Sequence, residues 1–350
     1  MATYKDSGVD IDAGDRAVEL MKASIARASR PEVMGGIGGF AGLFDASALK
    51  SMKQPLLATS TDGVGTKTEI ARQLGKYDTI GEDLVAMVVD DLVVCGAEPL
   101  FLTDYIAVGK VIPERIAEIV AGVARGCAKA RTALIGGETA EHPQLLGEDE
   151  FDIAGAATGV VEESKLLGAH RVQRGDVAIA ISSSGVHANG FSLVRHIIKS
   201  AQLKLESHVP ELSQTLGEAL LVPTTIYSAD LLDLIADVEV HAMAHITGGG
   251  LAANTERVLP THLALTVDRS TWELPPLFSF LQKSGSVPLA DLERTFNCGV
   301  GMVLIAPPTS MAGALAHLTS RGHTAWALGE LAPAGERPAG VKLEGAFQNR

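Results

Sequence analysis

The segment that most restricts how the chain can fold is residues 59–67, T-S-T-D-G-V-G-T-K. It follows the apolar run P-L-L-A and precedes an alternating polar and apolar stretch. This order predicts a strand, a tight turn and a helix. Glycine lets the backbone approach a ligand closely, and N–H groups at a helix start favour phosphate. Asp62 and Lys67 add a carboxylate for a cation and an ammonium for phosphate. An ordinary turn with a solvated acid and lysine is the alternative interpretation.

Length and composition indicate a folded protein with two domains. The 350 residues exceed the size of one ordinary core. Hydrophobic residues make up 46% of the chain and charged residues 20%, which is typical of globular proteins rather than disordered ones. The net charge of -13 argues against nucleic-acid binding, which needs clustered lysine and arginine. A small anionic ligand is still compatible with this charge if metal ions and glycine turns supply positive potential.

The cysteines and the N-terminal sequence indicate the compartment. Cys95, Cys127 and Cys298 are far apart, and no C-x-x-C is present. This pattern favours a reducing compartment and argues against a disulfide framework or a structural zinc site. The start M-A-T-Y-K-D-S-G is not a charged-then-apolar leader, and no apolar run reaches membrane-spanning length. We therefore expect a cytoplasmic protein without membrane association.

A second glycine-rich segment, residues 30–40, reads R-P-E-V-M-G-G-I-G-G-F and follows a predicted helix over residues 15–30. It is either a flexible surface loop or a backbone segment that lies against a ligand. It is not a dinucleotide-binding fingerprint, because no strand precedes it. No Walker-type P-loop occurs anywhere in the chain.

Acidic residues occur at unusual positions in the first half. Residues 78–95 are apolar nearly all round and predict a buried helix. Asp91 shares one stripe with Leu84 and Val88, so we expect it on a buried face, where it must be paired, hydrogen-bonded or metal-bound. A helix aspartate that caps a neighbouring loop is the alternative. Asp104 is the single acid of a predicted buried strand over residues 100–108, or else a turn or edge residue.

A short predicted strand over residues 133–135 ends in G-G-E-T-A-E-H-P, which we interpret as a second acidic glycine turn. Glu138 lies at its centre. Two such turns and the helix acid are the arrangement expected when carboxylates gather around Mg²⁺ and nucleotide phosphates.

The second half has glycine turns that are rich in hydroxyl groups instead. A polar, basic stretch near residue 168 predicts a domain boundary, which divides the chain into residues 1–168 and 169–350. Beyond it, a predicted strand leads into S-S-S-G-V-H-A-N-G and another leads into T-G-G-G. Such turns suit the sugar and phosphate of a ligand, although serine-rich turns also commonly cap helices. His187 and His245 lie in or just before these turns, and a catalytic and a structural role are equally compatible with each.

The other predicted elements are helices over residues 113–131, 218–236 (which Pro223 either interrupts or starts), 250–258 and 311–320, strands over residues 151–161, 176–181, 241–247 and 324–331, and a loose tail from residue 332.

Nine segments together resemble one family. They are Y-K-D-S-G-V-D-I-D-A-G (4–14), R-P-E-V-M-G-G-I-G-G-F (30–40), T-D-G-V-G-T-K (61–67), D-T-I-G-E-D-L-V-A-M (78–87), D-D-L-V-V-C-G-A-E-P-L-F (90–101), G-G-E-T-A-E (136–141), S-S-G-V-H-A-N-G-F-S-L-V-R (183–195), H-I-T-G-G-G (245–250) and R-T-F-N-C-G-V-G-M (294–302). The chain resembles the phosphoribosylformylglycinamidine cyclo-ligases, or AIR synthetases, of purine biosynthesis from near its start to its last third.

The resemblance implies an α+β fold of two domains, each a mixed β-sheet with helices packed on one side. The N-terminal domain would bind ATP and Mg²⁺ and form a homodimer through its sheet, and the C-terminal domain would be AIR synthetase-like. The pattern of residues alone favours βαβ units and a more parallel sheet.

The resemblance also implies a ligase. ATP would phosphorylate the formyl-amide oxygen of formylglycinamidine ribonucleotide, and a nitrogen of the amidine would then attack that carbon. The products would be 5-aminoimidazole ribonucleotide, ADP and phosphate. Such chemistry depends on positioning and charge neutralisation more than on covalent help from the protein. ATP and Mg²⁺ are the expected cofactors, and a monovalent cation is a further candidate.

The residues that would carry this chemistry fall into four groups. The metal ligands would be Asp62, Asp91 and Glu138. The ATP and phosphate contacts would be Gly36, Gly38, Gly39, Gly63, Gly65, Thr66, Lys67, Asp104, Gly136, Gly137 and Glu141. The substrate contacts would be Ser183, Ser184, Gly185, His187, Asn189, Thr247, Gly248 and Gly249. The catalytic residues would be Asp62, Lys67, His187 and His245.

Two departures from the family pattern affect this assignment. His142 and Gln144 follow the G-G-E-T-A-E segment, whereas the family commonly has methionine and glycine there, so the loop geometry is in doubt. Asp90 stands where an asparagine often precedes the metal-binding acid.

Three alternative functions share parts of this pattern. Small-molecule kinases and amidotransferase synthetases of the same superfamily share the acidic turns, but the second-half motifs favour the cyclo-ligases. A selenophosphate-type enzyme would need a reactive cysteine near the N-terminal glycines, where none occurs. A non-catalytic dimeric binding protein is disfavoured because every acidic position that the chemistry needs is filled.

Overall fold

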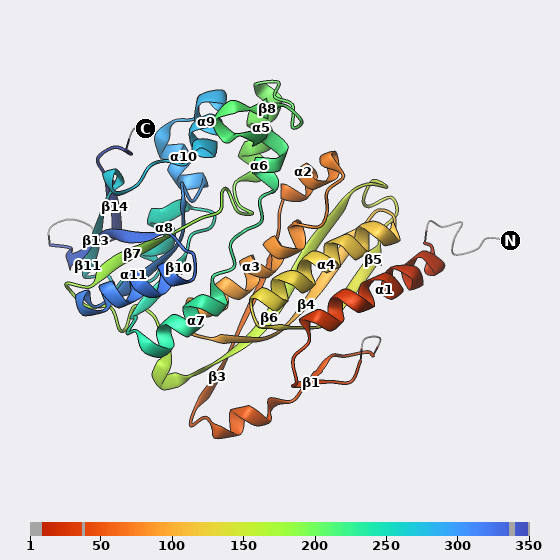
Figure 1. Cartoon of the computed structure of the whole chain (residues 1–350), viewed down its shortest axis with the longest axis horizontal. Coiled ribbons are helices and arrows are strands. Elements are labelled where there is room, and N and C mark those ends of the chain that lie inside the picture. The colour runs from red at the N-terminus through yellow and green to blue at the C-terminus, as the bar shows by residue number, and fades with distance from the viewer. Residues whose placement is uncertain (1–8, 37–38, 336–339, 349–350) are drawn as a thin grey trace. The chain divides into compact units, whose positions relative to one another are not determined.

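The computed structural model describes residues 9–36, 39–335 and 340–348, and it divides the chain into two compact units. The first unit contains Met1–Leu92 and Ala97–Ser164, and the second contains Val93–Gly96 and Lys165–Arg350. The main division therefore falls after Ser164, whereas the sequence places the boundary after residue 168. Each unit has its own sheet (Figure 1).

The first unit contains a four-stranded mixed sheet in the order β3-β6-β4-β5. These strands are β3 (Pro55–Gly63), β6 (Phe151–Glu162), β4 (Glu98–Val108) and β5 (Ala133–Glu141). The β3–β6 and β6–β4 pairs are antiparallel and the β4–β5 pair is parallel. A two-stranded hairpin, β1 (Val33–Met34) with β2 (Leu43–Phe44), belongs to the same unit.

Helices cover one face of this sheet. They are α1 (Ile11–Ile25), α2 (Lys67–Leu74), α3 (Ile80–Val93) and α4 (Pro113–Lys129). Helices α3 and α4 pack backbone to backbone, since a Cβ added at Gly81 or Gly122 would collide with the other helix or its connecting loop. On the sheet side, Leu84 of α3 lies against Gly155. Helix α3 is therefore enclosed between α4 and the sheet, which explains why its sequence is apolar nearly all round.

The other face of this sheet is only partly covered in the single chain, where Phe44 of the β1–β2 hairpin packs against Phe101 of β4. Side chains alternate between the two faces of a strand, and the outward positions of β3 and β4 include Leu57, Thr59, Thr103 and Tyr105. Leu57 is 66% exposed and Tyr105 is 42% exposed. This face therefore presents apolar and hydroxyl side chains to its surroundings.

The second unit contains a six-stranded mixed sheet in the order β10-β12-β7-β13-β11-β14. Its strands are β10 (Ala242–His245), β12 (Val300–Ala306), β7 (Val177–Ser182), β13 (Ala325–Pro333), β11 (Leu263–Asp268) and β14 (Gly340–Glu344). Only the β11–β14 pair of this sheet is parallel. The expectation of a loose tail from residue 332 is wrong, because β14 pairs with β11 and extends the sheet. A small hairpin joins β8 (His208–Val209) to β9 (Gln214–Thr215).

Hydrophobic residues pack on both faces of this second sheet. Ile179 and Ile181 of β7 face the cluster that contains α7 (Ser228–Asp237) and α11 (Met311–Ser320). The alternate residues Ala178 and Ala180 face a second cluster, which includes Leu251 of α8 (Gly250–Glu256). The remaining helices are α5 (Phe191–Ser200), α6 (Leu216–Leu221), α9 (Pro276–Gly285) and α10 (Leu289–Thr295).

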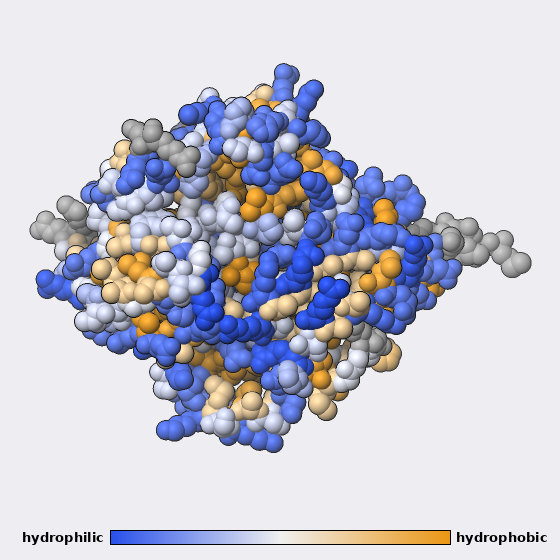
Figure 2. All heavy atoms as spheres, viewed as in Figure 1, coloured by the Kyte–Doolittle hydropathy of each residue, from blue (hydrophilic) through white to orange (hydrophobic). Residues whose placement is uncertain are grey.

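The fold class expected from the resemblance is confirmed, because both units are α+β with mixed sheets. The more parallel sheet that the residue pattern alone favours is wrong. In the view of Figure 2, hydrophilic residues cover most of the surface and apolar patches lie between them. Among the described residues, none of the helices combines the length and the apolar character needed to cross a membrane.

Candidate active site

The segment at residues 59–67 forms the expected strand, turn and helix, with Asp62 inside the end of β3. Its Oδ1 accepts a hydrogen bond from the backbone N–H of Gly63 at 2.7 Å. Gly65 adopts φ +58°, in the left-handed region that favours glycine. Helix α2 then begins at Lys67.

Lys67 does not point toward solvent, and its expected role as a phosphate contact and catalytic residue stays a prediction. Its side chain is fully buried, and Nζ lies 2.9 Å from Oδ1 of Asp83 on α3. Burial lowers the pKa of Lys67, and the neighbouring Asp83 carboxylate opposes that effect. The ion pair between Lys67 and Asp83 thus links helices α2 and α3 inside the unit.

The helix acids also occupy different positions from those expected. Asp91 is exposed on α3, and Asp90 is the buried member of the pair. The expectation that Asp91 lies on a buried stripe is therefore wrong. The residues of α3 before Asp91 are buried on every side of the helix. The apolar periodicity therefore does not predict which side of the last turn is exposed to solvent.

The expected acidic turn at residues 136–141 is part of strand β5. Strand register places Asp62, Gly155, Asp104 and Gly137 in one row across the sheet. Asp62 and Asp104 therefore share the helix-covered face, while Glu138, one residue further along, faces the other side.

The three expected metal ligands consequently do not converge within one chain. Asp62 lies on the β3 edge strand and Glu138 on the β5 edge strand, with two strands between them. Within the described part of the chain, no group of three or more His, Cys, Asp or Glu side chains is placed to hold a metal ion.

Asp104 is among the residues that line a cavity of about 240 Å³ bounded by α1, α4 and β5. Its Oδ2 atom is buried and has no hydrogen-bond partner in the described structure. Burial raises the pKa of Asp104 to about 7, which its own backbone N–H partly opposes. A Cβ at Gly137 would overlap Asp104 Oδ1, so a side chain at that position would force the carboxyl group to move. Gly137 therefore leaves space for the Asp104 carboxyl group in its present position.

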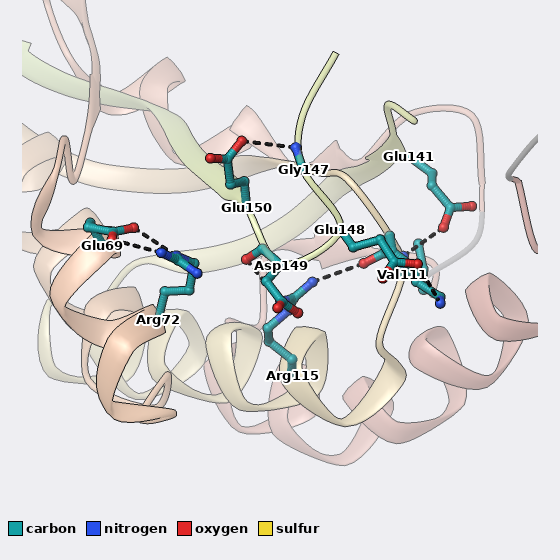
Figure 3. Close-up of polar contacts among 10 residues, drawn as sticks. Glu69, Arg72, Val111, Arg115, Glu141, Gly147, Glu148, Asp149 and Glu150 are labelled. Atoms are coloured by element: carbon teal, nitrogen blue, oxygen red, sulfur yellow. Dashed lines mark hydrogen bonds and ion pairs between the residues drawn. The ribbon is translucent and has the colours of Figure 1, made fainter. Parts of the chain in front are cut away.

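Glu141 connects three segments of the first unit. Its two carboxylate oxygens accept hydrogen bonds from the backbone N–H groups of Asp10, at 2.8 Å, and Val111, at 2.7 Å. Figure 3 shows the second of these bonds beside the acidic loop of Glu148 and Asp149. With both oxygens occupied, Glu141 holds the start of α1 against the end of β4.

The two loop residues that depart from the family pattern, His142 and Gln144, have visible structural roles. Gln144 adopts φ +71°, the conformation that glycine would supply at this position. The ring Nε2 of His142 lies 3.0 Å from the hydroxyl oxygen of Tyr105. In the acidic loop nearby, the Arg115 guanidinium donates to the carbonyls of Lys110 and Asp149 (Figure 3).

The described part of the N-terminal glycine segment belongs to the β1–β2 hairpin. Gly36 and Gly39 are exposed there, and Gly38 lies outside the described residues. The exposed glycines leave the backbone accessible, so their expected contact with ATP stays a prediction.

In the second unit, three glycine turns meet at one end of the sheet. The Ser183 hydroxyl donates to Asn297 Oδ1 at 3.0 Å, and Asn297 Nδ2 donates to the Gly185 carbonyl at 2.8 Å. The Gly248 N–H donates to Asn189 Oδ1 at 3.1 Å. The turns after β7, after β10 and before β12 are thus joined by side-chain amides, and the structure brings the predicted substrate residues together.

The two histidines are buried among these turns. His187 is 2% exposed, adopts φ +63°, and its Nε2 accepts a hydrogen bond from the Ser184 N–H at 3.2 Å. His245 is 5% exposed and lies on β10 opposite Met302. Tyr227 packs beside His187 and donates its hydroxyl to the Ser182 carbonyl at 2.8 Å.

Sequence reasoning missed two asparagines that hold the turns. Asn254 Nδ2 donates to the carbonyls of Thr247, Gly248 and Gly250. Asn297 lies in the quoted segment R-T-F-N-C-G-V-G-M but received no role. A buried polar residue four positions after a glycine turn is the signal that could have identified Asn254, since such a group must find partners.

Comparisons with known proteins agree with the motif pattern. A model of the AIR synthase related protein N-terminal domain matches residues 44–161, and the C-terminal domain model matches residues 173–339. A phosphoribosylformylglycinamidine cyclo-ligase from Desulfitobacterium hafniense is 51% identical over 329 residues, which cover 94% of this chain and 96% of that protein. One from Xanthomonas oryzae pv. oryzae is 50% identical over 334 residues, which cover 95% and 97%.

Solved structures share the fold at low sequence identity. Thiamine-monophosphate kinase from Stenotrophomonas maltophilia superposes with a TM-score of 0.66 at 19% identity, covering 95% of this chain and 97% of that one. The hydrogenase maturation protein HypE, solved in complex with ATP, gives 0.60 at 18% identity and covers 97% and 92%. These similarities show a common architecture. The half-identical relatives span nearly the whole chain, and the chain therefore belongs to the phosphoribosylformylglycinamidine cyclo-ligase family.

Proposed function

We propose that the protein closes the imidazole ring of 5-aminoimidazole ribonucleotide from formylglycinamidine ribonucleotide in purine biosynthesis, with conversion of ATP to ADP and phosphate. The observation that carries this proposal is the 50–51% identity to cyclo-ligases over almost the full length of both chains. The proposal makes the protein a cytoplasmic ligase.

The reaction needs ATP because a carbonyl oxygen is a poor leaving group. Transfer of the γ-phosphoryl group to the formyl oxygen converts it into a phosphate ester. The amidine-side nitrogen then forms a bond to the formyl carbon, the carbon–oxygen bond breaks, and inorganic phosphate leaves with that oxygen. One proton is lost from the attacking nitrogen. The protein contributes by holding the two reactants in line and by neutralising charge.

We propose that ATP binds to the first unit. The support is its strand–turn–helix at Asp62, the exposed glycines of the hairpin, and the fold shared with a protein solved with ATP. Because Lys67 is buried, we propose that backbone N–H groups of the turn bind the phosphates, which requires no side-chain charge.

Mg²⁺ is proposed to enter with the nucleotide. Mg²⁺ is usually held by one or two carboxylates together with substrate phosphates and water, so a preformed three-ligand cage is not needed. Asp62, Asp91 and Glu138 are the candidate ligands because they offer hard oxygen donors. A monovalent cation is a further candidate for the same phosphates.

We propose that the joined turns of the second unit bind the ribonucleotide substrate. Ser184, Gly248 and Gly249 are exposed there and present hydroxyl and backbone groups. His187 and His245 are buried, and we propose that they hold these turns in place.

We propose a homodimer through the partly covered face of the first sheet. A second copy of this chain fits because it would cover apolar positions such as Leu57 and Tyr105. Replacing Leu57 by arginine would place two unpaired charges in a symmetric interface. Sedimentation should then show monomers for Leu57→Arg and dimers for wild type, and a dimeric variant would locate the interface elsewhere.

The activity test combines two readouts on the purified protein. With Mg²⁺-ATP and formylglycinamidine ribonucleotide, we expect ADP and a coloured derivative of the aminoimidazole to appear in equal amounts, and neither without both substrates. ATP hydrolysis without aminoimidazole would point instead to a kinase or another enzyme of the same superfamily. ATP binding without turnover would point to a binding protein.

A further inference from the structure

Ser184 is an exposed residue of the turn that follows β7, and it uses its hydrogen-bond donors inside the protein. Its backbone N–H donates to Nε2 of His187 at 3.2 Å. Its hydroxyl donates to the carbonyl oxygen of Pro223 at 2.7 Å. A carbonyl oxygen can only accept, so the direction of this bond is fixed. The Ser184 hydroxyl therefore directs its proton to Pro223 and keeps only its oxygen lone pairs for a ligand.

The neighbouring Ser183 is bonded in the same manner. Its backbone N–H donates to the carbonyl oxygen of Gly299 at 3.0 Å, and its hydroxyl lies 3.0 Å from Asn297 Oδ1. The Gly299 N–H donates to the same Oδ1 at 2.9 Å, and Asn297 Nδ2 donates to the Gly185 carbonyl. These bonds fix the orientation of the amide, so the Ser183 hydroxyl must be the donor. The two serines thus present acceptors, because their donors are already committed.

The turn after β10 repeats this arrangement. Its exposed residue Gly248 donates its backbone N–H to Asn189 Oδ1 at 3.1 Å. A phosphate group binds through donors of the protein, so it gains nothing from these serine groups or from the Gly248 N–H. A ligand group that lies against Ser184 must instead supply the donor itself.

The substrate of the proposed reaction has such a donor in its amidine. In 5-aminoimidazole ribonucleotide the ribose is attached to a ring nitrogen, so the ribose-bearing nitrogen is the one that bonds to the formyl carbon. The other amidine nitrogen stays outside the ring as the amino group and carries N–H donors. An amidine is basic, and hydrogen bonds from a charged donor are stronger than those from a neutral one. The ribose hydroxyls are weaker candidates, because a hydroxyl can also accept and so does not require an acceptor-only site.

We propose that Ser184 Oγ accepts a hydrogen bond from the exocyclic amidine nitrogen of formylglycinamidine ribonucleotide, and that the Pro223 carbonyl positions Ser184 for this role. The inference rests on the proposed function and names the part of the substrate that this turn recognises. It also gives the turn a part in the reaction. By holding the nitrogen that does not react, Ser184 leaves the ribose-bearing nitrogen available to attack the formyl carbon.

The test compares this substrate with formylglycinamide ribonucleotide, which has a carbonyl oxygen in place of the exocyclic nitrogen and the same ribose and phosphate. Binding of each ribonucleotide is measured by calorimetry without ATP, so that no turnover occurs. The proteins are wild type, Ser184→Ala, Ser184→Thr and Ser320→Ala. Ser320 is the matched control, because it is exposed in the second unit and its hydroxyl also donates to a backbone carbonyl, that of His317, at 2.7 Å.

We expect wild type and Ser320→Ala to prefer the amidine by about tenfold or more, because the amide would place one acceptor against another. Ser184→Ala should lose most of this preference, and Ser184→Thr should keep it because threonine retains the hydroxyl.

An unchanged preference in Ser184→Ala would overturn the inference. If affinity for both ligands fell equally, Ser184 would instead contact the ribose or the phosphate, which the two ligands share. A wild type that consumes formylglycinamidine ribonucleotide with ATP but binds the amide equally well would also overturn the inference and leave the proposed function standing. The proposed function itself would fail if formylglycinamidine ribonucleotide were neither bound nor consumed.

Discussion

The buried carboxyl of Asp104 makes protein stability depend on pH in a direction opposite to that of most acids. Burial raises its pKa from 3.8 to about 7 in the folded protein. Between these two values the folded state binds the proton more tightly than the unfolded state does, so the free energy of unfolding falls as pH rises. Below the lower pKa, Asp104 is protonated in both states. Above the upper pKa, it is ionised in both states, and the folded protein carries the full cost of the buried charge.

The size of this penalty follows from the pKa difference. Each pKa unit corresponds to about 1.4 kcal/mol, so an ionised Asp104 lowers the stability of the folded state by on the order of 4 kcal/mol at pH 8. Asparagine has nearly the same shape and does not ionise. We therefore expect Asp104→Asn to gain stability relative to wild type between pH 4 and pH 8, by on the order of 4 kcal/mol.

The assay is urea unfolding without nucleotide at pH 4, 6 and 8, with the difference in unfolding free energy between variant and wild type as the readout. Asp15→Asn removes the same charge from an exposed position of α1 and serves as the control. A difference between Asp104→Asn and wild type that is the same at all three pH values would refute the reasoning. It would mean that the carboxyl keeps its charge in the folded protein at no cost.

Three further predictions concern other parts of the chain. Lys67→Met leaves a buried carboxylate without its ammonium and should lower the unfolding free energy by about 3–5 kcal/mol, whereas Lys22→Met, at an exposed ion pair, should change it by less than about 1 kcal/mol in urea unfolding. Asn297→Ala removes the amide that joins two turns and should lower kcat/KM by about tenfold or more, and Ser183→Ala, which loses one of these bonds, should lower it less. Asp91→Asn should abolish turnover while circular dichroism shows a folded protein, and near-normal activity would remove Asp91 from the metal site.

Local pattern predicted most of the elements well. Apolar runs next to turn residues located strands such as β7 and β10, and Pro113 at a first helical position located α4. The sheet order was not visible in the pattern, because strand pairing depends on contacts between distant segments. The prediction of a loose tail was wrong for the same reason, because β14 is a strand through its pairing with the edge of β11.

The site was harder to predict than the fold. Motifs identified the turns of the second unit, and the structure joins them, but Asn254 and Asn297 act through hydrogen bonds that no local spacing reveals. In the first unit, the sequence pattern predicts that Lys67 binds phosphate, whereas in the structure Lys67 forms a buried ion pair with Asp83. The two glycines before Glu138 predict a turn at this residue. In the structure Glu138 lies in strand β5, and Gly137 leaves space for the Asp104 side chain of the neighbouring strand β4.

The most direct test of the account follows one oxygen atom through the reaction. Formylglycinamidine ribonucleotide labelled with oxygen-18 in its formyl group is converted with Mg²⁺-ATP, and the products are analysed by mass spectrometry. If ATP activates the formyl oxygen, the label appears in inorganic phosphate at one atom for each aminoimidazole formed. Aminoimidazole formation with unlabelled phosphate would contradict the account, because the oxygen would then have left as water without phosphorylation.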